Sequence, residues 1–421
     1  MLSAIGAIIG LIIAILLIIK KVPPFYSLLL GALIGGMVGG MPLTDTVASM
    51  VGGIKDIVPA IVRILAAGIL SGVLIKTGGA EAIATGFIRK LGAKNISWAL
   101  ALSCMLLCAV GVFIDVAVIT IAPIAMLAAA RSKESNSKLL LMMIGGGKCG
   151  NIISPNPNTI IAAENFGADL SRVMAANIIP AVVGLLFTVL VISRLFRNTD
   201  SSDASSDAER TINEPSTKEL PNFWAALSGP IVAILLLALR PICGFTVDPM
   251  VALPVGGLAG LLIMRRGKIW RESIEYGLSK MAPIAVLLVG TGALAGIIKD
   301  SSLTSYIVAM LGGIQGGKYL IAPLAGILMS GATASTTAGA TIASSSFAPT
   351  VLQMGISAVW GAAMVNAGAT VIDHLPHGSF FHATGGSMEC SFKQRLRLIP
   401  YECLIGLVLT AVSVACCVMM N

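Results

Sequence analysis

Residues 145–159 read GGGKCGNIISPNPNT, and residues 366–380 read NAGATVIDHLPHGSF. Both stretches lie centrally in apolar runs that are long enough for two spans. Two prolines and four glycines stand within residues 145–157, a stretch that cannot remain a regular helix. Because lipid offers no hydrogen-bond partners, the freed backbone groups must line a wet cavity or meet a ligand. We therefore predict two broken helices, and a half-helix from about Asn158 would present its N-terminus to a carboxylate. Two loops at the membrane surface are the alternative interpretation.

The rest of the chain is strongly apolar. Of its 421 residues, 56% are apolar and 11% are charged, and the mean hydropathy is +0.93. An ordinary soluble domain carries about 25% charged residues, so this class is excluded. At about 20 apolar residues per crossing, the chain can supply ten or more spans. We predict an all-α polytopic membrane protein. The net charge of +8 comes mostly from short basic clusters between apolar runs, which indicate cytoplasmic anchors and no nucleic-acid partner.

One polar segment divides the chain into two halves. Residues 197–221 hold nine charged residues in 25, with almost nothing to bury, and are predicted to form a flexible linker. Residues 1–196 form the first predicted membrane repeat and residues 222–421 the second. Each half shows two long spans, an amphipathic piece, a hairpin and a broken helix in the same order. Duplicated halves of this kind are typical of secondary transporters.

The basic clusters predict the orientation of the two halves. Lys20 and Lys21 follow the first apolar run and place its N-terminus outside. From there the first half makes five crossings, an odd number, so the linker is cytoplasmic and the second half must be inverted. The prediction is two inverted repeats with about ten transmembrane helices, two re-entrant hairpins and two broken helices. In the second half, basic residues fall on the cytoplasmic side as expected: Arg265, Arg266, Lys268, Lys393, Arg395 and Arg397.

Polar residues inside the apolar runs mark candidate functional sites, because they are costly in a membrane. The two hairpin tips are expected at residues 111–115 and at residues 330–339, a stretch rich in glycine and hydroxyl groups. The second tip could hydrogen-bond an oxygen-rich solute or could serve helix packing. Asp115, Lys148 and Asp373 are the expected embedded charges. Each could instead belong to a structural ion pair.

The three histidines of the chain lie close together in the sequence, at His374, His377 and His382. A His-x-x-His pair with a proline between its members lacks the glutamate and the helical spacing of a zinc-protease motif. We therefore expect no metal site. His374 and His377 are candidates for proton binding, because an imidazole titrates near physiological pH.

On these residues the chain resembles the gluconate permease family, gluconate:proton symporters of the wider ion-transporter superfamily. The similar stretches are residues 154–157 (SPNP), 161–163 (IAA), 167–170 (GADL) and 373–378 (DHLPHG). The chain departs from the family pattern at Ser154, where a proline is usual, and at residues 378–381. The resemblance implies a carrier of gluconate or other hydroxy-acids. It also implies a homodimer in which the hairpins and broken helices move against a scaffold of long spans.

The predicted function is proton-coupled uptake of a small organic anion, a sugar acid or hydroxy-acid, across a bacterial cytoplasmic (inner) membrane. The anion is expected between the helix breaks and hairpin tips, with Lys148 as counter-charge and its oxygens held by Asn151, Asn156, Asn158, Thr159, Thr336, Thr337 and Ser379. For the proton, Asp373 with His377 is favoured, and Asp115 and His374 are alternatives. The coupling ion is H⁺, and no cofactor or catalytic residue is expected. A sodium-coupled dicarboxylate carrier of the same architecture and an intramembrane hydrolase are the rival classes.

Overall fold

The computed structural model describes residues 3–92, 95–132, 134–196, 220–303, 305, 316–376 and 378–420. The regular elements of this part of the chain are helices. The predicted linker, residues 197–221, lies outside the described residues except for Leu220 and Pro221.

The first half forms two apolar helices of 16 and 15 residues, a helix of 34 residues, a hairpin and a broken helix. Its elements are α1 (Ala4–Ile19), α2 (Pro24–Val38), α3 (Leu43–Lys76), α4 (Gly79–Leu91), α5 (Ile96–Ala109), α6 (Ile114–Ser132), α7 (Asn136–Asn151), α8 (Pro157–Phe166), α9 (Leu170–Ala176), α10 (Ile178–Leu186), the π-helical turn η2 (Phe187–Ile192) and α11 (Ser193–Leu195).

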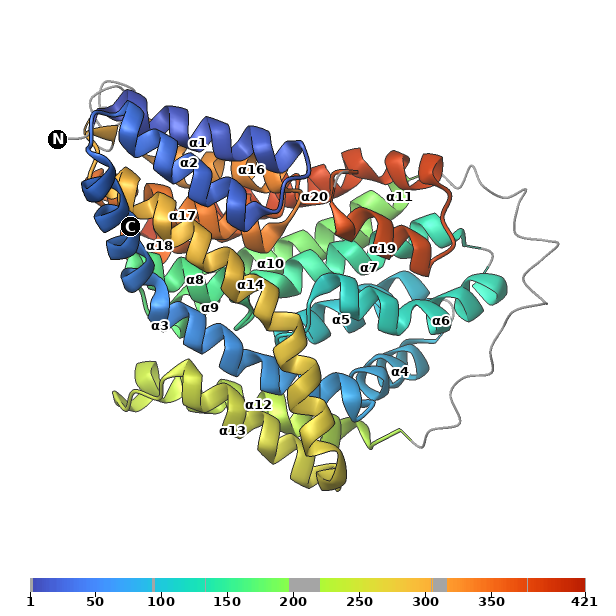
Figure 1. Ribbon diagram of the computed structural model, residues 1–421. Helices are drawn as coiled ribbons and strands as arrows, with labels where there is room; N and C mark the ends of the chain where they lie inside the picture. Colours follow the sequence, from blue (N-terminus) through green and yellow to red (C-terminus); the bar gives the residue numbers. More distant parts are fainter. Residues whose placement is uncertain are drawn as a thin grey trace.

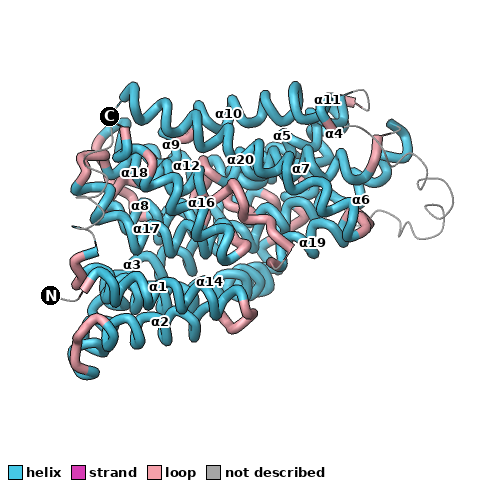
Figure 2. Tube along the Cα trace, turned by 90° about the horizontal axis from the view of Figure 1, so that it is seen from above, coloured by secondary structure: helices cyan, strands magenta, loops and turns pink. Residues whose placement is uncertain are grey.

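The second half follows the same order of elements. They are α12 (Phe223–Cys243), α13 (Pro249–Ile263), the short η3 (Gly267–Ile269), α14 (Trp270–Lys299), the short η4 (Gly317–Tyr319), α16 (Ile321–Thr333), α17 (Thr336–Gln353), α18 (Ala358–Gly368), α19 (Ser379–Ser387) and α20 (Phe392–Met420). In both views of the chain, the two termini lie at one end of the molecule and α11 lies at the other (Figures 1 and 2).

The longest helices, α3 and α14, cross each other along the middle of the molecule (Figure 1). Glycines let their backbones touch. A Cβ on Gly53 would meet the backbone of Gly292, and a Cβ on Gly277 would meet the backbone of Gly68. A Cβ on Gly72 would likewise meet the carbonyl oxygen of Ser273. Since later residues of α3 meet earlier residues of α14, the two helices run antiparallel. Small residues at such a crossing are the usual means of close helix packing in membranes.

The hairpins and broken helices pack together beside this crossing. In the first half, α5 and α6 form a hairpin whose α5 lies against α7. The corresponding hairpin of α16 and α17 lies against α18 in the second half. The two broken helices also meet each other, because α8 packs on both α17 and α18. This arrangement brings residues 145–159 and 366–380 into one buried region.

The helix breaks lie where proline and glycine predict them. The first helix ends at Asn151 and the next begins at Pro157, close to the predicted start at Asn158. The second helix ends at Gly368, and α19 begins at Ser379. The hairpin tips fall at residues 110–113 and 334–335, inside or beside the predicted tips.

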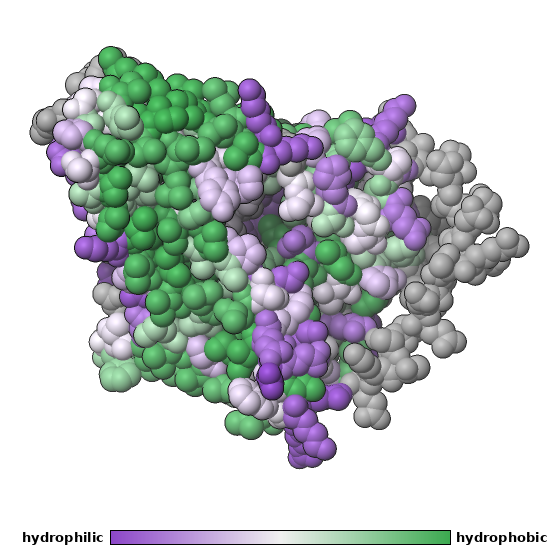
Figure 3. Space-filling view, viewed as in Figure 1, coloured by the Kyte–Doolittle hydropathy of each residue, from purple (hydrophilic) through white to green (hydrophobic). Residues whose placement is uncertain are grey.

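The surface carries the apolar side chains that a bilayer requires. Over α1, α2, α3 and α14 the molecule is largely hydrophobic, and hydrophilic residues gather toward the opposite end (Figure 3). Large exposed side chains on these helices include Leu16, Leu30, Val62 and Val286. Four helices of the described chain are long and apolar enough to cross a membrane: Leu43–Lys76, Leu170–Leu195, Gly267–Lys299 and Phe392–Met420. Six shorter apolar helices accompany them.

Replacing Gly53 by alanine tests the glycine crossing. The added methyl would overlap the α14 backbone, and such overpacking typically costs about 1–3 kcal/mol. We expect a lower melting temperature for Gly53→Ala in detergent, measured by the loss of the monodisperse size-exclusion peak on heating. Gly52→Ala is the matched control: it lies in the same helix with open space around it, so the better helix propensity of alanine should leave stability equal or higher. Equal melting temperatures for the two variants would contradict the crossing.

Candidate functional site

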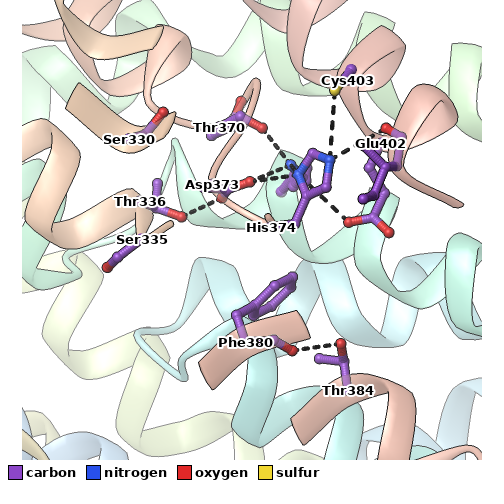
Figure 4. Close-up of polar contacts among 12 residues, drawn as sticks. Ser330, Ser335, Thr336, Thr370, Asp373, His374, Phe380, Thr384, Glu402 and Cys403 are labelled. Carbon is purple, nitrogen blue, oxygen red and sulfur yellow. Dashed lines mark hydrogen bonds and ion pairs between the residues drawn. The ribbon is translucent and has the colours of Figure 1, made fainter. Parts of the chain in front are cut away.

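The buried region where the two broken helices meet is the candidate site. Its polar residues come from the end of α7, from the break between α18 and α19, from the tip of the α16–α17 hairpin and from α20. Figure 4 shows those of the second break, the hairpin tip and α20. The break and the hairpin tip touch directly, because a Cβ on Gly378 would meet the backbone of Ala334. Ala334 itself has a positive φ of 47°, which closes the tight turn of the tip.

Five ionisable residues form a connected group, here called the charge cluster. They are Lys148, Asp373, His374, Arg395 and Glu402, and the exposed fraction of each residue is 2% or less. Charges buried in an apolar surrounding must be paired and hydrogen-bonded, because their desolvation is expensive. In this cluster Lys148 pairs with Asp373, and Arg395 pairs with Glu402.

The Lys148 ammonium bonds to three acceptors in the second helix break. It donates to Asp373 Oδ1 at 2.6 Å and to the carbonyl oxygen of Thr370, and its Nζ lies 3.0 Å from His374 Nδ1. A lysine ammonium has three N–H donors, so each donor finds one acceptor. The other oxygen of Asp373 accepts a hydrogen bond from the Thr336 hydroxyl, which ties the hairpin tip to the cluster.

The His374 ring lies between the two carboxylates of the cluster. Its Nδ1 is 3.0 Å from Asp373 Oδ1 and 3.6 Å from Glu402 Oε2. Its Nε2 is 3.3 Å from the Ile399 carbonyl oxygen and 3.6 Å from Cys403 Sγ. A neutral ring with its proton on Nε2 donates to that carbonyl and accepts from Lys148 at Nδ1. It then donates to neither carboxylate, and Asp373 and Glu402 are held by Lys148 and Arg395 instead.

Arg395 and Glu402 form the other ion pair of the cluster, one at each end of a two-turn stretch of α20. The guanidinium donates to both oxygens of the Glu402 carboxylate, with Nη2 at 3.3 Å from Oε2. Arg395 also donates to the Phe381 carbonyl oxygen and lies 4.9 Å above the centre of the Phe381 ring. The pair therefore fixes α19 against α20 as well as balancing a buried carboxylate.

A second buried group, here called the amide cluster, occupies the first helix break. Its members are Asn151, Asn156, Asn158, Thr159 and Asn366, each exposed by 3% or less. The Asn158 amide donates to Asn366 Oδ1 at 2.7 Å, and the Asn366 amide donates to Thr159 Oγ1 at 3.0 Å. Asn156 donates to Asn151. These bonds join the two broken helices, one helical turn from the charge cluster.

Three oxygens of the first break have no partner among the described residues. They are Asn156 Oδ1, Asn158 Oδ1 and Ser154 Oγ. A buried polar atom without a hydrogen bond costs free energy, and it points to a water or ligand that satisfies it. All three stand within five residues of one another, at the start of α8.

The remaining predicted site residues lie in different places. Thr337 stands beside Thr336 at the start of α17 and is half-buried, whereas Ser379 is exposed at the start of α19. Asp115 lies in the first turn of α6, where its carboxylate accepts a hydrogen bond from the Val116 N–H, and it does not join the charge cluster. His377 lies outside the described residues.

Two members of the charge cluster were not expected from the sequence. The sequence context of Arg395 predicts a cytoplasmic anchor, but the residue is buried, with 1% of its surface exposed. Glu402 is not among the candidates that the sequence predicts. Their spacing is the sequence signal that could have found the pair. Arg395 and Glu402 are opposite charges seven residues apart on one helix, so they lie on the same face.

A third polar group lies at the far end of α8. Arg63 of α3 binds Glu164 of α8 and also Asp248, the N-cap residue of α13. A cavity of about 170 Å³ lies beside them. The guanidinium of Arg63 hydrogen-bonds the Asp248 carboxylate and so holds the pKa of that carboxyl below its ordinary value. This group ties the first broken helix to the long helices.

Comparison with known proteins identifies the class. Residues 2–420 match the family described as GntP family permease. An uncharacterised transporter of Haemophilus influenzae is 53% identical over 98% of this chain and 97% of its own length. A gluconate permease of Pseudomonas aeruginosa is 26% identical over 90% of this chain and 89% of its own. The crystal structure of the Alcanivorax borkumensis YdaH transporter shares the fold, with a TM-score of 0.63 at 16% identity over 89% of this chain and 88% of that one.

The apolar helices indicate a multi-pass membrane protein, and the family match defines it as a permease. The chain belongs to the GntP permease family.

Replacing Arg395 by alanine tests the role of the charge cluster in the fold. The change leaves Glu402 buried without its partner, and breaking one side of a buried ion pair typically costs about 3–5 kcal/mol. We expect a large fall in the melting temperature of the purified protein. The double variant Arg395→Met, Glu402→Leu should recover much of the loss, because neither charge remains.

Arg271→Ala is the matched control. Arg271 forms an exposed ion pair with Glu275 on the surface of α14, a kind of pair that adds little stability in water. A fall in melting temperature as large as that of Arg395→Ala would argue against burial as the cause.

Proposed function

We propose that this transporter takes up a small organic anion, gluconate or a related sugar acid or hydroxy-acid, together with a proton. The observation that carries the proposal is the charge cluster, whose formal charges cancel when His374 is neutral. Lys148 and Arg395 balance Asp373 and Glu402. A buried group of this kind can accept a further negative charge only at a high cost, unless a positive charge arrives with it.

A proton on His374 supplies that positive charge. The protonated ring would donate from Nδ1 toward Asp373, 3.0 Å away, and would also face Glu402 Oε2 at 3.6 Å. Lys148 would then share Asp373 with the imidazolium. An anion bound nearby restores neutrality, so anion and proton favour each other's binding. If one conformation of the carrier binds the anion and the proton together more tightly than the other does, binding of the two shifts the carrier toward that conformation.

The first helix break supports the choice of substrate. The unpartnered oxygens of Ser154, Asn156 and Asn158 accept hydrogen bonds, and the hydroxyl groups of a sugar acid donate them. Thr336, Thr337 and Ser379 offer further hydroxyls around the second break. The carboxylate of the substrate would face the N-terminal end of α8, where helix N–H groups favour negative charge.

The proposal includes the arrangement of the two halves. Residues 1–196 and 222–421 would be inverted repeats joined by a cytoplasmic linker at 197–221. The antiparallel crossing of α3 and α14 supports this arrangement, because equivalent glycines occupy equivalent contacts on both helices: Gly53 with Gly292, and Gly277 with Gly68. A carrier of this type would work as a homodimer in the bacterial inner membrane, with about ten crossings and two re-entrant hairpins.

Sodium coupling is the second candidate, and one observation favours it. The unpartnered oxygens of the first break form an oxygen-only set, the type of ligand that hard cations take. A sodium-coupled carrier of di- or tricarboxylates would use the same architecture.

Uptake of labelled gluconate into proteoliposomes separates these candidates. With the interior alkaline and sodium replaced by choline, we expect gluconate to accumulate, and a protonophore to abolish the accumulation. His374→Gln and Asp373→Asn should each abolish it, since the first removes the proposed proton site and the second removes its closest acceptor. From the sequence alone, His377→Ala is also predicted to abolish gluconate accumulation.

His382→Gln is the matched control, because His382 is exposed, hydrogen-bonds the Pro376 carbonyl oxygen and packs against the rings of Phe381 and Phe392, with no described contact to the charge cluster. This variant should keep wild-type accumulation. Gluconate uptake that needs sodium and ignores the pH gradient would reject proton coupling, and uptake of a dicarboxylate alone would also reject the substrate.

A further inference from the structure

The two helix breaks differ in what fills them. The first break leaves three buried oxygens without a partner in the described chain. The second break contains the ammonium of Lys148, which reaches across from α7 with none of its side chain exposed. The same kind of backbone interruption therefore holds an amino group in one half of the molecule and open oxygens in the other.

The surroundings of the Lys148 ammonium are those of a bound cation. The Thr370 carbonyl lies just after the last residue of α18, where carbonyl oxygens lack partners within the helix. Asp373 Oδ1 adds a negative charge at 2.6 Å. Freed carbonyls and a carboxylate at a broken helix are the ligands with which transporters hold a small monovalent ion. His374 Nδ1 completes the three contacts at 3.0 Å.

We infer that Lys148 is a built-in cation at the second helix break, and that shortening its side chain opens a site for a small free cation. The ligand class is a monovalent cation of the size of Na⁺ or methylammonium. The site would be formed by the Thr370 carbonyl, the Asp373 carboxylate and the His374 ring. In the native chain the tethered ammonium occupies this position permanently, so the second break takes up no sodium.

The inference concerns cation binding and is independent of the transported substrate. It rests on two features of the structure. The three donors of the ammonium match the three acceptors, and Asp373 has no other cationic partner among the described residues apart from the neighbouring His374. A variant that lacks the ammonium leaves that carboxylate buried without its ammonium partner, a state that an incoming cation relieves.

Thermal stability of purified Lys148→Ala in detergent tests the inference. The variant should melt well below wild type in choline chloride, because choline is too large for the vacated space. Sodium chloride or methylammonium chloride should each raise its melting temperature by at least about 3 °C relative to choline at equal ionic strength. Wild type should show no such difference, since its own ammonium fills the site.

Two further variants complete the design. Lys148→Met carries no charge but fills about the same volume, so it leaves no vacant site. Neither sodium nor methylammonium should raise its melting temperature. Lys148→Ser also shortens the side chain and leaves the space open, so it should respond as Lys148→Ala does. If the alanine variant does not fold in choline, its recovery from membranes prepared in methylammonium or sodium is the readout.

The inference is overturned if neither Lys148→Ala nor Lys148→Ser responds to a cation, or if neither can be recovered with a cation present. An equal response from Lys148→Met would also overturn it, because that variant has no vacant site. These measurements contain no substrate and no pH gradient. A failure of gluconate uptake by the wild type would therefore leave them unaffected.

Discussion

The pairing of two buried basic side chains with two buried carboxylates constrains the rest of this structure. Lys148, Asp373, Arg395 and Glu402 would each cost several kcal/mol if left alone. The Lys148–Asp373 pair holds α7 against the break after α18, and His374, 3.6 Å from Glu402, joins that break to α20. The pairing also explains why the second helix break can exist inside an apolar protein, since the carbonyl oxygen that the break frees accepts a hydrogen bond from Lys148.

The two breaks have taken on different chemistry within one shared architecture. In the first break, neutral amides bond to each other across the two broken helices and leave acceptor oxygens unpartnered in the described chain. In the second break, the polar atoms are engaged by charges. Because the two groups are one helical turn apart along α7 and α18, a solute held by the first would lie close to the charges of the second. Recognition of hydroxyl groups and response to a proton can therefore be separate tasks of neighbouring sites.

The breaks and hairpin tips could be predicted because proline and glycine act locally. Pro155 and Pro157 disfavour a continuous helix, and the structure breaks there, with Pro157 as the first residue of α8. The cost of embedded charge likewise singled out Lys148 and Asp373. Their partners could not be predicted, because pairing depends on which helices pack together. Arg395 follows a polar turn and has the sequence context of a membrane anchor, yet α20 turns it inward toward Glu402. Asp115, equally conspicuous in the sequence, accepts a hydrogen bond from the Val116 N–H and has no contact with the cluster among those described.

The central claim is that anion and proton enter together because the charge cluster must remain neutral. Its most direct test is the response of gluconate accumulation to membrane potential in proteoliposomes. The potential is set by potassium and valinomycin at a constant pH gradient. One proton with one monovalent anion moves no net charge, so accumulation should follow the pH gradient and stay unchanged when the potential is reversed. Accumulation that rises and falls with the potential at a fixed pH gradient would contradict the account.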